Sequence, residues 1–201
     1  MDNRSFSPQD SLQVIQSMID KTKTEIGENS IYFLLWGWLV FIGCLLQYYL
    51  LVIVKTPQHY LAWTIVLVGV FFSVMYSVKH RQKKKVVTYV GESMGVLWTG
   101  MSVSFLTLCF ILSRIGWQYA FPIYILMYAT GTFISGGILK FKPLQVGGII
   151  CWILAVAATF ASYQNQILLT AAAILASYLV PGYLLKKKGK PTAMGQSKTL
   201  A

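Results

Sequence analysis

Residues 60–113 read YLAWTIVLVGVFFSVMYSVKHRQKKKVVTYVGESMGVLWTGMSVSFLTLCFILS, and this stretch decides the fold. Two uncharged and mainly apolar runs, 60–78 and 93–113, enclose the basic segment KHRQKKK at 79–85. The hydrocarbon core of a bilayer is about 30 Å thick and an α-helix rises about 1.5 Å per residue, so about 20 apolar residues can cross it. The stretch therefore predicts two transmembrane helices joined by a basic loop.

The same pattern extends over most of the 201 residues. The chain is 56% apolar and 11% charged, whereas soluble domains are about 25% charged. Six runs are long enough to cross a bilayer, and short connections between them predict three helical hairpins. We therefore expect an all-α membrane protein with a segment at 1–30, a six-span membrane domain at 31–185 and a basic tail of disordered composition at 186–201. The predicted spans are 31–53, 60–78, 93–113, 117–139, 146–163 and 167–185.

The distribution of positive charge predicts the orientation. Of 17 Lys and Arg residues, 15 lie in the N-terminal segment, the second-to-third connection, the fourth-to-fifth connection and the tail. Only Lys55 and Arg114 lie in the other connections. Cytoplasmic loops of membrane proteins carry an excess of Lys and Arg. Both termini are therefore predicted to be cytoplasmic.

The net charge of +11 would suggest nucleic acid in a soluble protein, but the orientation rule accounts for these cations and no nucleic-acid partner is expected. Lysines at the ends of spans also attract anionic lipid, by about 1 kcal/mol each near the membrane surface. We expect the lipid bilayer as a partner, with anionic lipid at the cytoplasmic face. The candidate lipid contacts are Lys83, Lys84, Lys85, Lys186, Lys187 and Lys188.

A separate amphipathic helix is predicted at about 8–27, before the first span. Ser7 and Pro8 provide a cap and a first helical position. Its apolar residues recur at helical spacing, and its polar face mixes acids and bases. The apolar face could pack on the cytoplasmic ends of the protein's own spans, form a dimer seam or bind a cytoplasmic protein partner. The residues of this face are Leu12, Ile15, Met18, Ile19 and Ile26.

The distribution of acids argues against enzymatic and proton-coupled chemistry. Five of the six carboxylates lie in the first 30 residues, and Glu92 is the sixth. His59 and His80 are predicted on opposite sides of the membrane, so they cannot share a site. Acid–base catalysis needs titratable groups near the reacting atoms, and metal sites need clustered ligands. No enzyme activity, cofactor or metal is expected.

The third and fourth spans carry a stripe of polar and small residues. On the third span, Glu92, Thr99 and Ser102 belong to a row spaced by three or four residues, which places them on one helix face. Two readings remain open, a narrow uncharged pathway or close packing between small residues. The candidate residues are Glu92, Thr99, Ser102, Tyr124, Tyr128 and Ser135.

Four other residues inside spans have simpler interpretations. Gln47 lies in the first span, where a neighbouring helix can satisfy its amide. Cys44, Cys109 and Cys151 also lie within spans and are predicted to be buried free thiols. None of the four is expected to form a site.

The segment SLQVIQSMIDKTKTEIGENSIYFLLWGWLVFIGCL at 11–45 resembles small, uncharacterised polytopic proteins of bacterial inner membranes. The resemblance covers about the first fifth of the chain, implies a bacterial inner membrane and implies no activity. Two functions are consistent with the sequence. The first is a non-enzymatic membrane scaffold or signalling component with a cytoplasmic partner. The second is a small transporter or channel for a neutral or lipid-like solute.

Overall fold

The computed structural model describes residues 30–81 and 89–188, and this part of the chain is helical with no strand. The first helix spans Ser30–Ile53 and ends in a π-helical turn, η1 (Tyr49–Ile53). Six helices are long and apolar enough to cross a membrane, which indicates an integral membrane protein. The remaining elements are η2 (His59–Thr64), α2 (Ile65–Arg81), α3 (Tyr89–Ile115), η3 (Trp117–Tyr119), α4 (Ala120–Ile138), α5 (Lys142–Thr159), α6 (Tyr163–Ile174), η4 (Leu175–Leu179) and α7 (Val180–Lys188).

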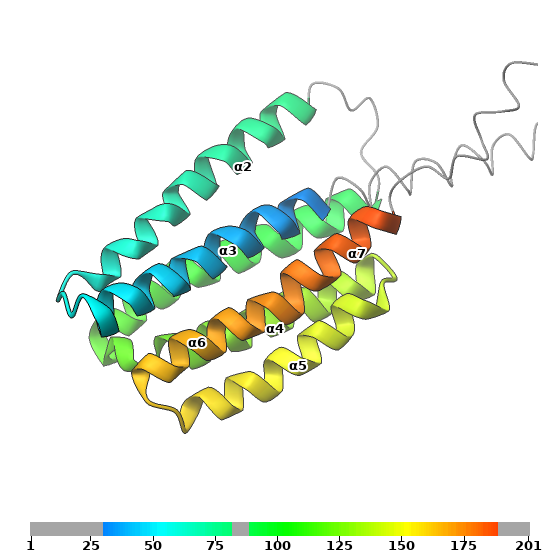
Figure 1. Ribbon diagram of the computed structural model, residues 1–201. Helices are drawn as coiled ribbons and strands as arrows, with labels where there is room; N and C mark the ends of the chain where they lie inside the picture. Colours follow the sequence, from blue (N-terminus) through cyan, green and yellow to red (C-terminus); the bar gives the residue numbers. More distant parts are fainter. Residues whose placement is uncertain (1–29, 82–88, 189–201) are drawn as a thin grey trace, which may run out of the picture.

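The helices run up and down alternately, so their connections gather at two ends of a bundle (Figure 1). One end, here called the basic end, carries Lys79, Lys140, Lys142, Lys186 and Lys187. The opposite end, here called the far end, carries Lys55 and Arg114. At the far end the turn between α3 and η3 passes through Gly116, whose φ of 113° favours glycine.

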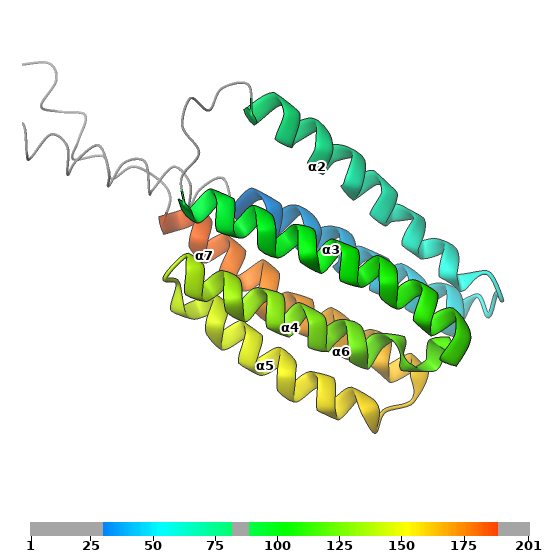
Figure 2. The ribbon, with the colours of Figure 1, turned by 180° about the vertical axis from the view of Figure 1, so that it is seen from behind.

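The six spans differ in how far they are enclosed by the others. The last span, formed by α6, η4 and α7 in succession, is 56% buried over its most apolar 18 residues, whereas the spans of α2 and α3 are each 11% buried. Figures 1 and 2 show α2 at one margin of the bundle, beside the first helix, and α5 at the opposite margin. The described helices therefore form a closely packed group of α4, α5 and the last span, with α2 and α3 more exposed.

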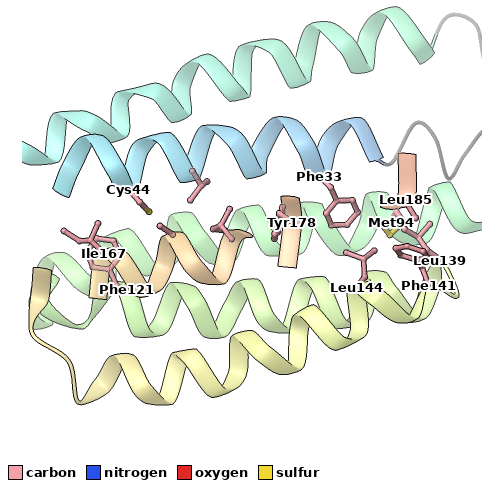
Figure 3. Close-up of a cluster of buried hydrophobic side chains, with 13 residues drawn as sticks. Phe33, Cys44, Met94, Phe121, Leu139, Phe141, Leu144, Ile167, Tyr178 and Leu185 are labelled. Atoms are coloured by element: carbon pink, nitrogen blue, oxygen red, sulfur yellow. The ribbon is translucent and has the colours of Figure 1, made fainter. Parts of the chain in front are cut away.

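The core lies along the last span (Figure 3). Towards the basic end, Phe33 of the first helix packs against Tyr178 of η4, with ring centroids 5.4 Å apart. Towards the far end, Phe121 of α4 and Ile167 of α6 are buried near Cys44 of the first helix. Burying such side chains stabilises a membrane protein mainly through close van der Waals packing, because lipid is as apolar as the core.

Adjacent glycines allow α5 to approach two neighbours. A Cβ atom added to Gly147 would lie 2.9 Å from the carbonyl oxygen of Ala176 in η4. A Cβ atom added to Gly148 would lie 2.8 Å from Cβ of Phe133 and 2.9 Å from the carbonyl oxygen of Ala129, both in α4. Small residues let membrane helices pack backbone to backbone. Gly147 and Gly148 therefore fix the position of α5 against α4 and η4.

The fifth and sixth spans meet at a different point from the one expected. The sequence predicts a fifth span up to residue 163, but α5 ends at Thr159 and α6 begins at Tyr163. Ser162 has extended backbone angles that end the connection. Gln166 is buried and its Nε2 donates to the carbonyl oxygen of Ala161 at 3.1 Å. The amide nitrogen of Gln166 is thus satisfied locally, whereas its buried Oε1 has no hydrogen-bond partner among the described residues.

Candidate functional site

The predicted polar residues of α3 are exposed with respect to the other described helices. Glu92 lies in the first turn of α3, at the basic end, and its side chain is exposed. Thr99 and Ser102 are exposed too. A Cβ atom added to Gly95 or Gly100 would meet no atom within 4 Å. This outward surface of α3 is here called the α3 face, and it comprises Gly95, Val96, Thr99, Gly100, Ser102, Val103, Ser104, Leu106 and Thr107.

The hydroxyl groups of the α3 face are satisfied within the helix. Thr99 Oγ1 donates to the carbonyl oxygen of Gly95 at 2.7 Å, and Ser102 Oγ donates to that of Trp98 at 2.8 Å. Ser104 and Thr107 make the same bond to the residue four positions earlier, at 2.9 Å each. Such bonds let Ser and Thr face an apolar medium without an unpaired donor.

The corresponding residues of α4 point into the bundle. Ser135 is buried and donates to the carbonyl oxygen of Gly131 at 2.7 Å. The ring of Tyr128 packs on Phe105 of α3 and Tyr178 of η4, at centroid distances of 5.0 and 5.6 Å. Tyr124 Oη lies 3.1 Å from the Sγ atom of Cys109 in α3. On α3 the described contacts of Tyr124 and Tyr128 are therefore with Cys109 and Phe105, whereas Glu92, Thr99 and Ser102 are exposed.

Two buried hydroxyls lie between α4 and η4. Thr132 is fully buried, Tyr178 is 2% exposed, and their hydroxyls are neighbours. Neither hydroxyl makes a hydrogen bond of regular geometry in the described part of the chain. Tyr178 also packs edge-on against Trp98 of α3, with centroids 6.2 Å apart. The buried hydroxyls of Thr132 and Tyr178 therefore lie between α4 and the last span.

A polar junction at the far end joins three spans through Gln47. Trp63 Nε1 of η2 donates to Gln47 Oε1 at 2.8 Å. Gln47 Nε2 lies 3.3 Å from both His59 Nδ1 of η2 and Tyr163 Oη of α6. The indole N–H can only donate, so it fixes which way the Gln47 amide points. The amide nitrogen then donates to His59 Nδ1, and the imidazole proton lies on Nε2.

The sequence contained a signal for this junction that pattern reasoning did not use. Gln47 is 2% exposed and lies about three quarters of the way along an apolar run. In an alternating bundle that depth matches the beginnings of the second and sixth spans, where His59, Trp63 and Tyr163 occur. A side-chain amide at membrane depth needs partners from other helices. Combining depth with topology would have brought these four residues together.

The cysteines and the remaining candidate residues differ in their exposure and in whether their side chains are described. Cys44 and Cys151 are buried free thiols as expected, but the prediction of burial is wrong for Cys109, which is exposed. Lys186 and Lys187 are exposed at the end of α7. The candidate residues outside those whose side chains are described are Leu12, Ile15, Met18, Ile19, Ile26, Lys83, Lys84, Lys85 and Lys188.

Comparison of the chain with protein-family models, with curated proteins and with solved structures gives no match. Across residues 30–81 and 89–188, no three His, Cys, Asp or Glu side chains come together in a group that could hold a metal ion.

Proposed function

We propose that this protein is a non-enzymatic membrane scaffold or signalling component that associates laterally with another membrane helix through the α3 face. The observation that carries the proposal is the outward orientation of Gly95, Thr99, Gly100 and Ser104. Gly, Ser and Thr are enriched where membrane helices touch, because they allow close backbone approach. On α5, by contrast, the outward residues are mainly large and aliphatic, as in Ile153.

The proposal includes a location and an orientation. The basic end is placed in the cytoplasm of a bacterial cell, at the inner membrane, with both termini on that side. Five lysines with described side chains lie at this end, against Lys55 and Arg114 at the other, and positive charge marks the cytoplasmic side. A cytoplasmic protein partner would then meet the segment at 1–29 and the basic connections. If the helix that packs on the α3 face comes from a second copy of the chain, the lateral association is homo-oligomerisation.

Site-specific photocrosslinking in the native membrane tests the lateral association. A photoreactive amino acid replaces Val103 at the centre of the α3 face, and Ile153 on the outer surface of α5 serves as the matched control. Both side chains are well exposed, at 59% and 65%. The Val103 position should give a discrete protein adduct whose mass identifies a second copy or a different partner, whereas Ile153 should react mainly with lipid. No protein adduct from Val103, or equal adducts from both positions, contradicts the proposal.

The cytoplasmic association has a separate test. The full chain is purified from the native membrane in mild detergent, with and without prior crosslinking, and the co-purified proteins are identified by mass spectrometry. A stoichiometric soluble partner supports the signalling form of the proposal. If no stoichiometric partner is found even after crosslinking, the cytoplasmic part of the proposal is wrong.

A second candidate function is a small transporter or channel for a neutral or lipid-like solute. The buried hydroxyls of Thr132 and Tyr178 favour it, because buried polar groups without regular hydrogen bonds are rare and attract ligands or water. They would move the pathway from the α3 face to the space between α4 and η4. Reconstituted vesicles loaded with neutral solutes test this function. Tyr178→Phe should then change flux and Ser102→Leu should not, and absence of flux across a broad panel contradicts it.

A further inference from the structure

A groove runs along the first helix at the basic half of the bundle. It has a volume of about 410 Å³ and is lined by Ile31, Leu34, Leu35, Trp38, Leu39, Ile42 and Lys186. The six residues from the first helix recur at intervals of three and one, so they form one stripe along a single helix face. Its lining is apolar except at Lys186. The groove is therefore a shallow, open slot parallel to the helix axis with one cationic end.

The last span packs beside this stripe of the first helix and contributes Lys186 to the lining of the slot. Gly182 of α7 is close to the first helix, because an added Cβ atom would lie 3.0 Å from Cδ2 of Leu34. One turn deeper, Trp38 Nε1 donates to Tyr183 Oη of α7 at 3.2 Å. The two helices run antiparallel, so Lys186 comes next to Ile31 at the basic end. The hydrogen bond between Trp38 and Tyr183 ties the exposed indole of the first helix to α7.

The dimensions of the slot match one leaflet of a bilayer. Residues 31–42 of a helix rise about 16 Å, whereas half of the hydrocarbon core is about 15 Å. The slot is vertical in the membrane, so an amphipathic helix lying along the surface could not fill it. A chain that enters from the surface and runs down one leaflet has the right direction and length. That description fits the acyl chain of a phospholipid.

The charge at the mouth of the slot specifies the headgroup. Lys186 lines the groove, and Lys187 beside it is exposed. Among the described residues the single carboxylate is Glu92, which lies on α3 rather than on the first helix or α7. A cation at the membrane surface attracts the phosphate of an anionic lipid. We propose that this groove binds one anionic phospholipid, with its phosphate at Lys186 and an acyl chain along Leu34, Trp38 and Ile42.

The inference is independent of the proposed scaffold function. The groove is formed by the first helix and Lys186 of α7, and it shares no residue with the α3 face. It is tested on the delipidated full chain in mild detergent by native mass spectrometry. Dioleoyl phosphatidylglycerol is titrated as the anionic probe and dioleoyl phosphatidylcholine as the zwitterionic probe with the same acyl chains. The wild type should retain one phosphatidylglycerol molecule at concentrations where phosphatidylcholine is not retained.

Two pairs of variants separate a built site from general attraction. Lys186→Gln should weaken binding of the first phosphatidylglycerol about fivefold, the factor expected for one lysine near an anionic surface. The neighbouring Lys187→Gln should change it less than about twofold, since its charge does not line the groove. Leu35→Trp fills the slot while keeping both lysines, and it should abolish selective retention. Ile149→Trp, on the outer surface of α5, should leave binding unchanged.

Each alternative gives a different result. If Lys186→Gln and Lys187→Gln weaken binding equally and Leu35→Trp has no effect, the lipid is held by diffuse charge and the proposal is wrong. If the folded wild type retains no phosphatidylglycerol at any concentration, the groove is covered by the segment at 1–29 or by a second copy, which also overturns it. Monodisperse elution of each variant on size-exclusion chromatography shows that it has folded.

Discussion

The helices α3 and α5 carry small residues on opposite surfaces. On α5, Gly147 and Gly148 face inwards, in contact with η4 and α4, and the outer surface bears large residues such as Ile153. On α3, Gly95 and Gly100 face outwards, and the inward surface bears large residues such as Trp98. The α5 arrangement is that of a helix whose interface lies within its own chain. Under the proposed lateral association, the small residues on the outward surface of α3 would instead contact a different helix.

The largest effect is expected from enlarging a small residue on the inward surface of α5. Gly148→Leu places a side chain against the backbone of α4, where an added Cβ atom alone lies 2.9 Å from the carbonyl oxygen of Ala129. Overpacking of this kind should lower the free energy of unfolding by about 3 kcal/mol. Thermal unfolding in detergent, followed by circular dichroism, measures it. Ala157→Leu, on the exposed surface of the same helix, is the control and should retain wild-type stability.

A smaller loss is expected at the junction that attaches the second span to the bundle. Gln47→Leu leaves Trp63 Nε1 without its acceptor and removes the donor to His59 and Tyr163. Losing this set should lower the free energy of unfolding by about 2 kcal/mol. The same unfolding measurement tests it, with the exposed Gln164→Leu as control. Equal stability of the Gln47 and Gln164 variants would show that the junction does not hold α2 in place.

The native cysteines allow the exposure of α3 and α5 to be compared without mutation. Cys109 of α3 is exposed and Cys151 of α5 is buried, where its Sγ donates to the carbonyl oxygen of Ala173 at 3.3 Å. A membrane-permeant maleimide should label Cys109 about tenfold faster, because burial limits access to the thiol. Peptide mass spectrometry over a labelling time course measures both rates. Comparable rates in the purified protein would contradict the exposure of Cys109 on α3.

The smallest effect on stability, and the most specific effect on association, is expected at the centre of the α3 face. Gly100→Leu should change the free energy of unfolding of the isolated chain by less than about 0.5 kcal/mol, because the added atoms meet no neighbour. It should nevertheless reduce the yield of the Val103 photoadduct several-fold. A stability loss as large as that of Gly148→Leu would mean that α3 packs against its own chain.

The sequence predicted the helices better than it predicted their faces. Length and apolarity are properties of single segments, so six membrane-crossing helices could be found in runs such as 93–113. Glu92, Thr99 and Ser102 were predicted to share one helix face, and their side chains are exposed on α3. Which neighbour that side meets depends on the rotation of α3 about its axis. Single-sequence periodicity shows that a face exists without showing what it contacts.

The same limitation explains the junction and the groove. Gln47 looked like a solitary amide because its partners lie 12, 16 and 116 positions away in the sequence. The lysines at 186 and 187 were predicted to contact lipid from their charge, but the slot beside Lys186 comes from side chains of the first helix. Both features require two helices to be placed side by side. No pattern within one helix contains that information.

The bonds from Thr99, Ser102, Ser104 and Thr107 to their own helix have a consequence for the lifetime of any complex formed by α3. A hydroxyl that is already satisfied gains little from meeting a partner and loses little on leaving one. The solitary chain is therefore stable in the bilayer while no neighbour is present. Attraction across this face would come from close backbone packing and dispersion alone, which favours transient over permanent association. Such a protein could exchange one helical partner for another without first unfolding.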